Sequence, residues 1–174
     1  MDDLRIITLP VERWQEYRAL RLHALQESPQ AFGSSYAENA GHPDEFWINR
    51  LRDVAAGRTP LLFAEAGDRL VGLIGAFFDP AGTGVAAIFA VFIVPECRGR
   101  GLGGRLVDAI LAELRQRPDA RVVRLAVNVS QTAAISAYRR AGFTVVATEL
   151  ARMGDGVEHD ELIMELALQR QTRD

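Results

Sequence analysis

The sequence contains no lysine: all 20 of its basic residues are arginines. A lysine holds the phosphates in NTPases with a G-K-[ST] loop, and a lysine forms the imine of Schiff-base and pyridoxal phosphate enzymes. The absence of lysine therefore excludes these classes. A phosphate site in this chain must be built from backbone amides and arginine.

Cysteine and histidine are also scarce. The single cysteine, Cys97, excludes an intramolecular disulfide and a cysteine-based zinc cluster, and it is typical of a reducing cytoplasm, where we expect the protein to reside. His23, His42 and His159 lie far apart in the sequence, so we expect no metal site.

Long hydrophobic runs and an excess of positive charge are missing as well. The longest apolar run, Val85–Val94, reaches about half of the ~20 residues that a membrane-spanning helix needs. The start, Met1-Asp2-Asp3, lacks the positive-then-apolar pattern of a signal peptide. The formal net charge of −3 provides no global basic field. We therefore expect neither nucleic acid nor a membrane as a partner.

The composition is that of an ordinary globular protein. The chain has 174 residues, of which 48% are apolar and 25% charged, and no segment has the composition of an interdomain linker. We therefore expect one domain that spans residues 1–174.

Hydrophobic periodicity predicts the elements of the first third of the chain. Leu4–Leu9 alternates weakly and predicts a short strand, whereas Val11–Glu27 has apolar residues at three- and four-residue spacing and predicts an amphipathic helix. Gln30–Gly41 has no clear period, so we expect a loop there. A second helix is predicted between Asp44 and Gly57.

The pattern changes after Pro60. Three apolar runs separated by turn signals predict an antiparallel meander of strands at Leu61–Ala66, Leu70–Phe78 and Val85–Val94. The last run is apolar throughout, so we expect a strand that is buried on both faces. Further along the chain we expect a helix at Leu102–Arg115, a strand at Arg121–Val127, a helix at Gln131–Arg140, a strand at Gly142–Thr148 and a last strand around Leu162–Leu168. The order β-α-α-β-β-β-α-β-α-β-β predicts an α/β fold with a mixed sheet and a parallel crossover in its middle.

The most informative segment is Val94-Pro95-Glu96-Cys97-Arg98-Gly99-Arg100-Gly101-Leu102-Gly103-Gly104, between a predicted strand and a predicted helix. Glycines let a ligand approach the backbone closely, and the first amides of a helix have no intrahelical acceptor. Together with the helix dipole these amides favour an anion, and Arg98 and Arg100 add local positive charge. A phosphate or pyrophosphate is the ligand that this segment favours.

Three interpretations of this segment are open. It can be a turn with exposed arginines. It can be a dinucleotide-binding loop, because Gly99, Gly101 and Gly104 satisfy G-x-G-x-x-G. It can also be taken as R-x-x-G-x-G, from Arg98 to Gly103.

The third interpretation leads to a resemblance that covers nearly the whole chain. The run V-P-x-x-R-G-x-G-x-G resembles the acetyl-CoA pyrophosphate loop of the GNAT superfamily of N-acetyltransferases. Ala134–Phe143 resembles the family pattern A-I-x-x-Y-x-x-x-G-F, and Asp160–Met164 resembles D-x-L-x-M of its final strand. Arg18–Ser35 is similar to a stretch found in many uncharacterised bacterial members.

The resemblance implies where acetyl-CoA, the cosubstrate, would bind. In the family two neighbouring parallel strands splay apart and hold the pantetheine arm through their backbone. That implies Phe92, Ile93 and Val94 as arm-binding residues and a backbone N–H at or near Ile93 as the donor to the reacting oxygen. The implied remaining contacts are Arg98, Gly99, Arg100, Gly101, Leu102, Gly103, Gly104, Gln131, Ala134 and Tyr138.

Tyr138 corresponds to the tyrosine that protonates the departing thiolate in the family, so the resemblance implies a catalytic role. For a helical aromatic residue close to Gly142 the alternative is packing in the core. The chain departs from the family pattern at Gln131, where members usually have asparagine. Glutamine keeps the amide donor and acceptor but is longer, and the role is not transferred to the nearby Asn128.

The general base is not assigned by the sequence, because Val85–Val94 contains no ionisable residue and Glu96 belongs to the loop. The carboxylates and imidazole that remain as candidates are Glu38, Glu65, Asp79, Glu149, His159 and Glu161. In such folds the acceptor pocket is formed by segments that correspond here to Ser28–Pro43 and Leu150–His159. Phe32, Tyr36 and Trp47 can form its aromatic wall or pack the helices onto the sheet.

The sequence thus favours an N-acetyltransferase that moves the acetyl group of acetyl-CoA directly to a primary amine. The acceptor can be a small amine, an antibiotic-like amine, or an amino group of a peptide or protein. The alternatives are a non-catalytic module that binds or senses acyl-CoA and a dinucleotide-dependent oxidoreductase. A homodimer is a further expectation from the resemblance.

Overall fold

One mixed sheet of seven strands organises the protein, in the order β1-β2-β3-β4-β5-β7-β6. The computed structural model describes residues 4–169, so the acidic start at Met1-Asp2-Asp3 and the end of the expected 1–174 domain lie outside the described residues. The strands are β1 (Leu4–Ile7), β2 (Leu61–Ala66), β3 (Arg69–Phe78), β4 (Val85–Ile93), β5 (Val122–Asn128), β6 (Thr144–Arg152) and β7 (Glu158–Ala167). The helices are α1 (Trp14–Glu27), α2 (Tyr36–Ala40), α3 (Asp44–Ala55), α4 (Leu102–Arg115) and α5 (Thr132–Arg140).

The predicted antiparallel meander and central parallel pair are confirmed. Strands β2, β3 and β4 form an antiparallel meander, β4 pairs with β5 in parallel, and β7 lies antiparallel between β5 and β6. The predicted mixed α/β fold with a parallel pair at its centre is therefore the observed one.

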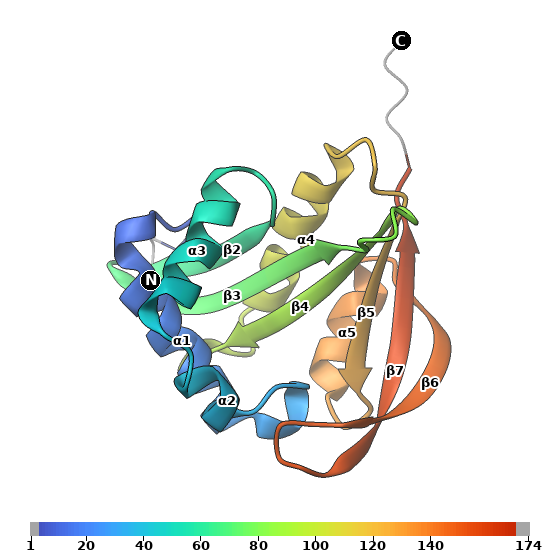
Figure 1. Cartoon of the computed structure of the whole chain (residues 1–174). Helices are drawn as coiled ribbons and strands as arrows, with labels where there is room; N and C mark the ends of the chain where they lie inside the picture. Colours follow the sequence, from blue (N-terminus) through green and yellow to red (C-terminus); the bar gives the residue numbers. More distant parts are fainter. Residues whose placement is uncertain (1–3, 170–174) are drawn as a thin grey trace.

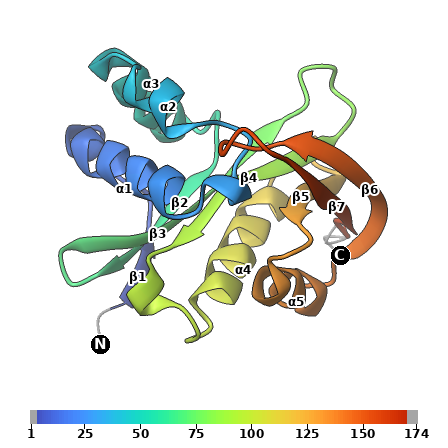
Figure 2. The same ribbon diagram turned by 90° about the horizontal axis from the view of Figure 1, so that it is seen from below.

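The helices lie on both faces of the sheet. Figures 1 and 2 show α1, α2 and α3 on one face and α4 and α5 on the other. Helix α4 packs against β2, β3 and β4. Its buried side recurs at helical spacing, as predicted, through Leu102, Leu106, Val107, Ile110, Leu111 and Leu114.

Two local expectations are wrong. The loop expected at Gln30–Gly41 contains the short helix α2, which a capping box stabilises: the Glu38 N–H donates to the Ser35 side chain, and the Ser35 N–H donates to the Glu38 carboxylate at 2.8 Å. Strand β4 is not buried on both faces, because buried residues alternate along it with half-buried ones such as Phe89 and Val91. Its half-buried face borders the cavities described below.

The central parallel pair opens along its length. Register partners of β4 and β5 are limited to Val85–Ala87 and Val122–Arg124, and the two strands then diverge (Figure 1). Within the open part the register between β3 and β4 shifts by one residue, Ala90 has a φ of 56°, and neither Ala90 nor Val91 has a described register partner. This β-bulge interrupts the register of β3 and β4 beside the opening.

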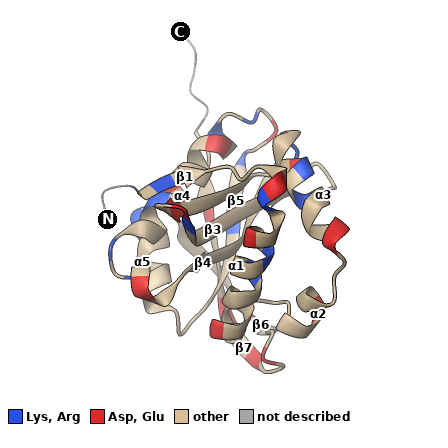
Figure 3. Ribbon diagram, turned by 90° about the vertical axis from the view of Figure 1, so that its left-hand side faces the viewer, with Lys and Arg blue, Asp and Glu red and all other residues tan. Residues whose placement is uncertain are grey.

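The surface of the described residues carries charges of both signs. In Figure 3 basic and acidic segments are interspersed along α1 and α3. Within residues 4–169, no helix is long and apolar enough to cross a bilayer, and no three or more His, Cys, Asp and Glu side chains gather where they could hold a metal ion.

Candidate functional site

Two cavities occupy the opening between β4 and β5. The larger has a volume of about 780 Å³ and lies on the side of α1 and α3, and the smaller has about 580 Å³ and lies on the side of the glycine loop and α5. Five residues border both cavities: Ala31, Phe32, Val91, Gln131 and Tyr138. The two cavities therefore meet at one place, where a ligand in one can touch a ligand in the other.

The segment between α1 and α2 crosses the opening and is held at two points. The Asn128 side chain at the end of β5 donates to the carbonyl of Gln30 at 3.1 Å. The Gly154 N–H in the β6–β7 turn donates to the carbonyl of Phe32 at 2.7 Å. A Cβ at Gly154 would overlap the Ser34 carbonyl oxygen, so only glycine lets the two segments approach this closely.

The smaller cavity ends at a helix N-terminus that is open to an anion. Helix α4 begins after Gly101, whose φ of 75° is left-handed, and no side chain caps it. The amides of its first turn consequently have no partner from a capping side chain. Gly99, with a φ of 73°, and the glycines at positions 103 and 104 complete a backbone surface along the cavity. This arrangement fits a phosphate group, as the sequence predicts.

Most of the residues that the resemblance implied for the cofactor lie together in this smaller cavity. Those that line it are Phe92, Ile93, Arg98, Gly99, Gly101, Leu102, Gly103, Gly104, Gln131, Ala134 and Tyr138. Val94 and Arg100 do not line it. Val94 is buried, and its N–H donates to the Val71 carbonyl, which leaves this amide unavailable to a ligand. Their roles as cofactor contacts stay predictions.

Arg98 is engaged by protein groups. Its guanidinium lies 2.6 Å from the Glu27 carboxylate, and its Nε donates to the carbonyl of Ile93 at 2.9 Å. The guanidinium also lies 5.6 Å from the centre of the Phe92 ring. Arg98 therefore fixes the glycine loop to α1 and to the end of β4, and Glu27 balances the charge that the sequence suggested for a phosphate.

Tyr138 combines the two roles that the sequence left open. Its side chain is buried and packs at an angle against Phe143, with ring centres 6.0 Å apart. It also borders both cavities, and its hydroxyl has no hydrogen-bond partner among residues 4–169. Burial raises the pKa of Tyr138 to about 12, so the phenol keeps its proton at neutral pH.

Gln131 and Asn128 have different functions in the structure. Gln131 immediately precedes α5, and its side chain makes no capping hydrogen bond and borders both cavities. The side-chain oxygen of Asn128 accepts from the N–H and the hydroxyl of Ser130, and its amide nitrogen donates to Gln30. Asn128 is thus occupied in joining segments, and the cofactor role of Gln131 stays a prediction.

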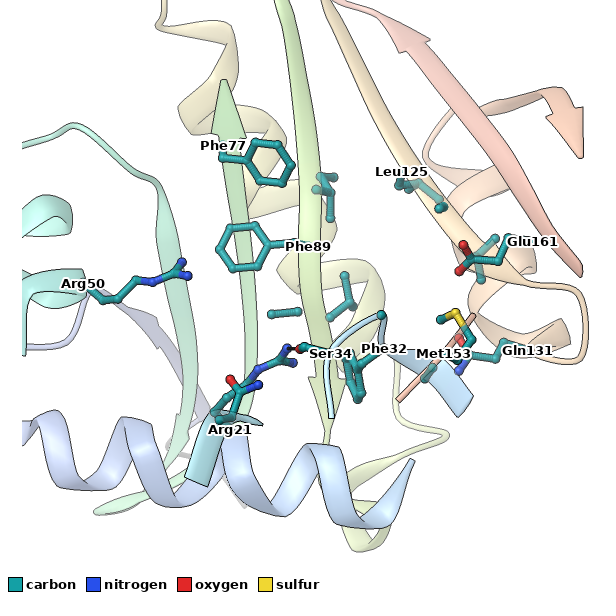
Figure 4. Close-up of a pocket in the computed structure, with 18 of the residues that line it drawn as sticks. Arg21, Phe32, Ser34, Arg50, Phe77, Phe89, Leu125, Gln131, Met153 and Glu161 are labelled. Atoms are coloured by element: carbon teal, nitrogen blue, oxygen red, sulfur yellow. Dashed lines mark hydrogen bonds between the residues drawn. The ribbon is translucent and has the colours of Figure 1, made fainter. Parts of the chain in front are cut away.

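Glu161 is the candidate base that the structure places in the larger cavity. It lies on β7, directly across from the exposed Glu149 of β6. Burial, together with the negative charge of Glu149, raises the pKa of Glu161, although His159 opposes this shift. Figure 4 shows Glu161 near Gln131 and Met153 on one side of the cavity. A carboxylate with a raised pKa suits proton abstraction.

Most of the remaining candidate bases, and the loop residue Glu96, are engaged elsewhere. Glu38 caps α2, Glu65 pairs with Arg5 and Arg13, Asp79 accepts within its own turn, Glu96 pairs with Arg69, and His159 pairs with Asp155. None of these residues lines either cavity, and neither does Glu149.

The aromatic residues proposed for the acceptor pocket divide between the two alternatives. Phe32 borders both cavities, Trp47 is fully buried in the core, and Tyr36 is exposed and lines neither cavity. The sequence analysis did not identify Arg21, Arg50, Phe77, Phe89 and Met153, which line the larger cavity. For Arg21 a signal exists, because it follows the buried Tyr17 by four residues and so lies on the buried side of α1.

The sheet opens between two parallel strands, and a glycine loop and an uncapped helix lie at the opening. These features are typical of proteins that bind a phosphate-bearing ligand inside the sheet. The chain belongs to the acetyltransferase (GNAT) family, whose model matches residues 14–143.

Solved structures and curated relatives agree with this assignment. A GNAT-family acetyltransferase from Streptococcus pneumoniae superposes with a TM-score of 0.85 over 96% of this chain and 100% of that chain, at 18% identity. A proposed acetyltransferase from Salmonella typhimurium, solved with its cofactor acetyl-CoA, superposes with a TM-score of 0.80 over 99% and 98% of the two chains, also at 18% identity.

Among relatives by sequence, a mycothiol acetyltransferase from Geodermatophilus obscurus is 36% identical over 122 residues, which is 64% of this chain and 39% of that protein. The chain thus spans about two fifths of the length of the curated relatives that it matches.

Proposed function

We propose that this chain, as one domain over residues 1–174, transfers the acetyl group of acetyl-CoA to the amino group of a small acceptor. Acetyl-CoA would occupy the smaller cavity, with its pyrophosphate at the glycine loop, and the acceptor would occupy the larger one. Supplied there, acetyl-CoA contributes an acetyl group activated as a thioester. A cytoplasmic location and a homodimer stay predictions.

The observation that carries this proposal is the meeting of the two cavities at Phe32, Val91, Gln131 and Tyr138. Transfer between two bound molecules requires the reacting atoms to lie about 3–3.5 Å apart, away from bulk water. A binding or sensing module needs the first cavity alone. A second cavity that opens onto the same residues is what a transferase requires.

The described residues fit three tasks at this junction. Tyr138, whose phenol carries its proton at neutral pH, can donate that proton to the sulfur as the thiolate leaves. The amide of Val91, a bulge residue without a described register partner, is suited to donate to the developing negative charge on the carbonyl oxygen of the acetyl group. Val91 lies two residues before Ile93, the position that the resemblance implied for this donor. Glu161 is suited to take the proton from the acceptor ammonium, directly or through one water.

The test is to incubate the protein with acetyl-CoA and a panel of primary amines and to measure the release of free thiol. We expect release that depends on the amine and falls when Tyr138 is replaced by phenylalanine. Stabilisation of the fold by CoA without release on any amine would support the non-catalytic acyl-CoA module instead.

A further inference from the structure

Two arginines line the larger cavity opposite Glu161. Arg21 comes from α1 and Arg50 from α3, and Figure 4 shows both side chains directed into the cavity, with Gln131, Met153 and Glu161 on its other side. The Arg21 guanidinium lies 4.7 Å from the centre of the Phe32 ring and donates to the Ser34 hydroxyl at 3.0 Å. Phe32 borders both cavities, so these contacts bring the charge of Arg21 beside the junction.

Neither arginine has an acidic partner among residues 4–169. The Nη1 atom of Arg21 is fully buried and has no hydrogen-bond partner. Arg50 lies 5.1 Å from the ring centre of Phe46 and 5.9 Å from that of Phe89, and no described carboxylate pairs with it. By contrast, the exposed arginines Arg52 and Arg58 pair with nearby carboxylates. Two arginines without such a partner in one cavity leave a charge that a ligand can satisfy.

The cost of this arrangement indicates that it serves a ligand. Burial, with a smaller contribution from the nearby charge of Arg50, lowers the pKa of Arg21. A buried cation is unfavourable unless it is paired and hydrogen-bonded. Packing alone would be achieved at lower cost by an apolar side chain of similar length.

The charges of the cavity also select against a simple amine. Its described lining has two arginines and one carboxylate, Glu161. An acceptor whose only charge is an ammonium group would be repelled by the arginines. An acceptor with an ammonium at one end and an oxyanion at the other would match the carboxylate and the arginines together.

We propose that the acceptor is a primary amine that also carries a carboxylate or phosphate group, and that Arg21 and Arg50 bind this group while the amine faces Tyr138 and Glu161. The planar guanidinium offers paired N–H donors to either oxyanion. This inference rests on the proposed function and specifies the substrate class of the same site.

The experiment compares acceptors in matched pairs: amino acids against their amides, and amino-sugar phosphates against the free amino sugars. Thiol release from acetyl-CoA gives kcat/KM for the wild type, for Arg21→Met, for Arg50→Gln and for the control Arg52→Gln on the exposed side of α3. We expect at least one anionic acceptor to exceed its neutral partner about 10- to 100-fold, the range of one or two charged hydrogen bonds. This preference should disappear in Arg21→Met and Arg50→Gln through a rise in KM, and persist in Arg52→Gln. The acceptor pair that shows this preference identifies whether the bound group is a carboxylate or a phosphate.

A second measurement is independent of catalysis. Inorganic phosphate and acetate are added to each variant in the presence of saturating CoA, which occupies the glycine loop. The thermal unfolding temperature is recorded, which also shows that the variants fold. We expect one of the anions to raise Tm of the wild type and of Arg52→Gln, and not of Arg21→Met. Equal turnover of neutral and anionic partners would overturn the inference and leave the proposed function standing. If no amine were acetylated, the proposed function would fail. The anion site would then be judged by Tm alone: a rise with an anion that is lost in Arg21→Met would support it, and no rise in the wild type would overturn it.

Discussion

The guanidinium of Arg98 lies 2.6 Å from the carboxylate of Glu27, although the two residues are 71 positions apart in the sequence. This ion pair joins the last residue of α1 to the glycine loop before α4. Since the same guanidinium also donates to the Ile93 carbonyl, one side chain connects the glycine loop to both α1 and the end of β4. The position of the loop therefore depends on a contact that no local sequence pattern contains.

Replacing Glu27 by glutamine should make the free energy of unfolding less dependent on pH in the acid range. The ion pair with Arg98, and the contact with Ser28, lower the pKa of Glu27 from the ordinary value of 4.5. Its stabilisation is thus fully present above that pH and is lost as the pH falls through the folded-state pKa. For a pair this exposed we expect about 0.2–1 kcal/mol at neutral pH. Urea unfolding of wild type and Glu27→Gln across the acid range measures this difference. Glu12→Gln, at an exposed glutamate, should show none.

Tyr138→Phe should lower turnover at least about tenfold and change CoA affinity little, because it removes a proton donor and keeps the ring in place. Steady-state rates at saturating substrate and a CoA titration measure the two effects. Tyr36→Phe is the control, since Tyr36 is exposed and lines neither cavity. The pKa of about 12 also predicts that Tyr138 contributes no titration to the rate profile near neutral pH. Unaltered turnover would remove Tyr138 from the mechanism.

Glu161 should set the acidic limb of the rate profile. A base must be deprotonated, and the pKa of Glu161 is raised by burial and by Glu149, so kcat/KM should fall with decreasing pH already above the ordinary carboxyl range. Glu161→Gln should abolish this limb and lower kcat/KM. Glu149→Gln removes the like charge and should move the limb to lower pH while retaining the rate. An unchanged profile in both variants would exclude Glu161 as the base.

Gly154→Ala should destabilise the fold by about 1–3 kcal/mol, as overpacking does. The added Cβ would meet the backbone oxygen of Ser34 and weaken the hydrogen bond from Gly154 to Phe32. Chemical denaturation measures the loss. Gly33→Ala is the matched control in the same crossing segment, because no atom lies within 4 Å of a Cβ there. Similar stability of the two variants would show that the crossing segment is not held by this contact.

The sequence was sufficient for the meander, the central parallel pair and the glycine loop before α4, because these depend on local signals. The strands of the meander and the loop before α4 can be predicted from short runs of consecutive residues, which are apolar in the strands and rich in glycine in the loop. Helix α2 was missed, although Ser35 and Glu38 have the spacing of a capping box, because its apolar pattern is too short to show a period. The exposure of one face of β4 was also missed, since it results from the divergence of β5, which composition does not record.

The residues that line the larger cavity were predicted only in part, for a different reason. Arg21, Arg50 and Glu161 come from α1, α3 and β7 and meet only in the folded protein. In the sequence Arg21 and Arg50 look like ordinary charged surface residues, and Glu161 was one of six candidate bases with no signal that singled it out. For the two arginines the one available signal was the place of Arg21 on the buried side of α1. This signal indicates an anion site only when Arg50 is known to lie in the same cavity.

The central claim is direct transfer where the two cavities meet, and initial rates with both substrates varied test it most directly. If acetyl-CoA and the amine must be bound together, double-reciprocal lines intersect, as the shared border at Tyr138 and Gln131 predicts. Parallel lines, with the acetyl group recovered on Cys97, which lines the smaller cavity, would contradict the account and indicate a covalent relay.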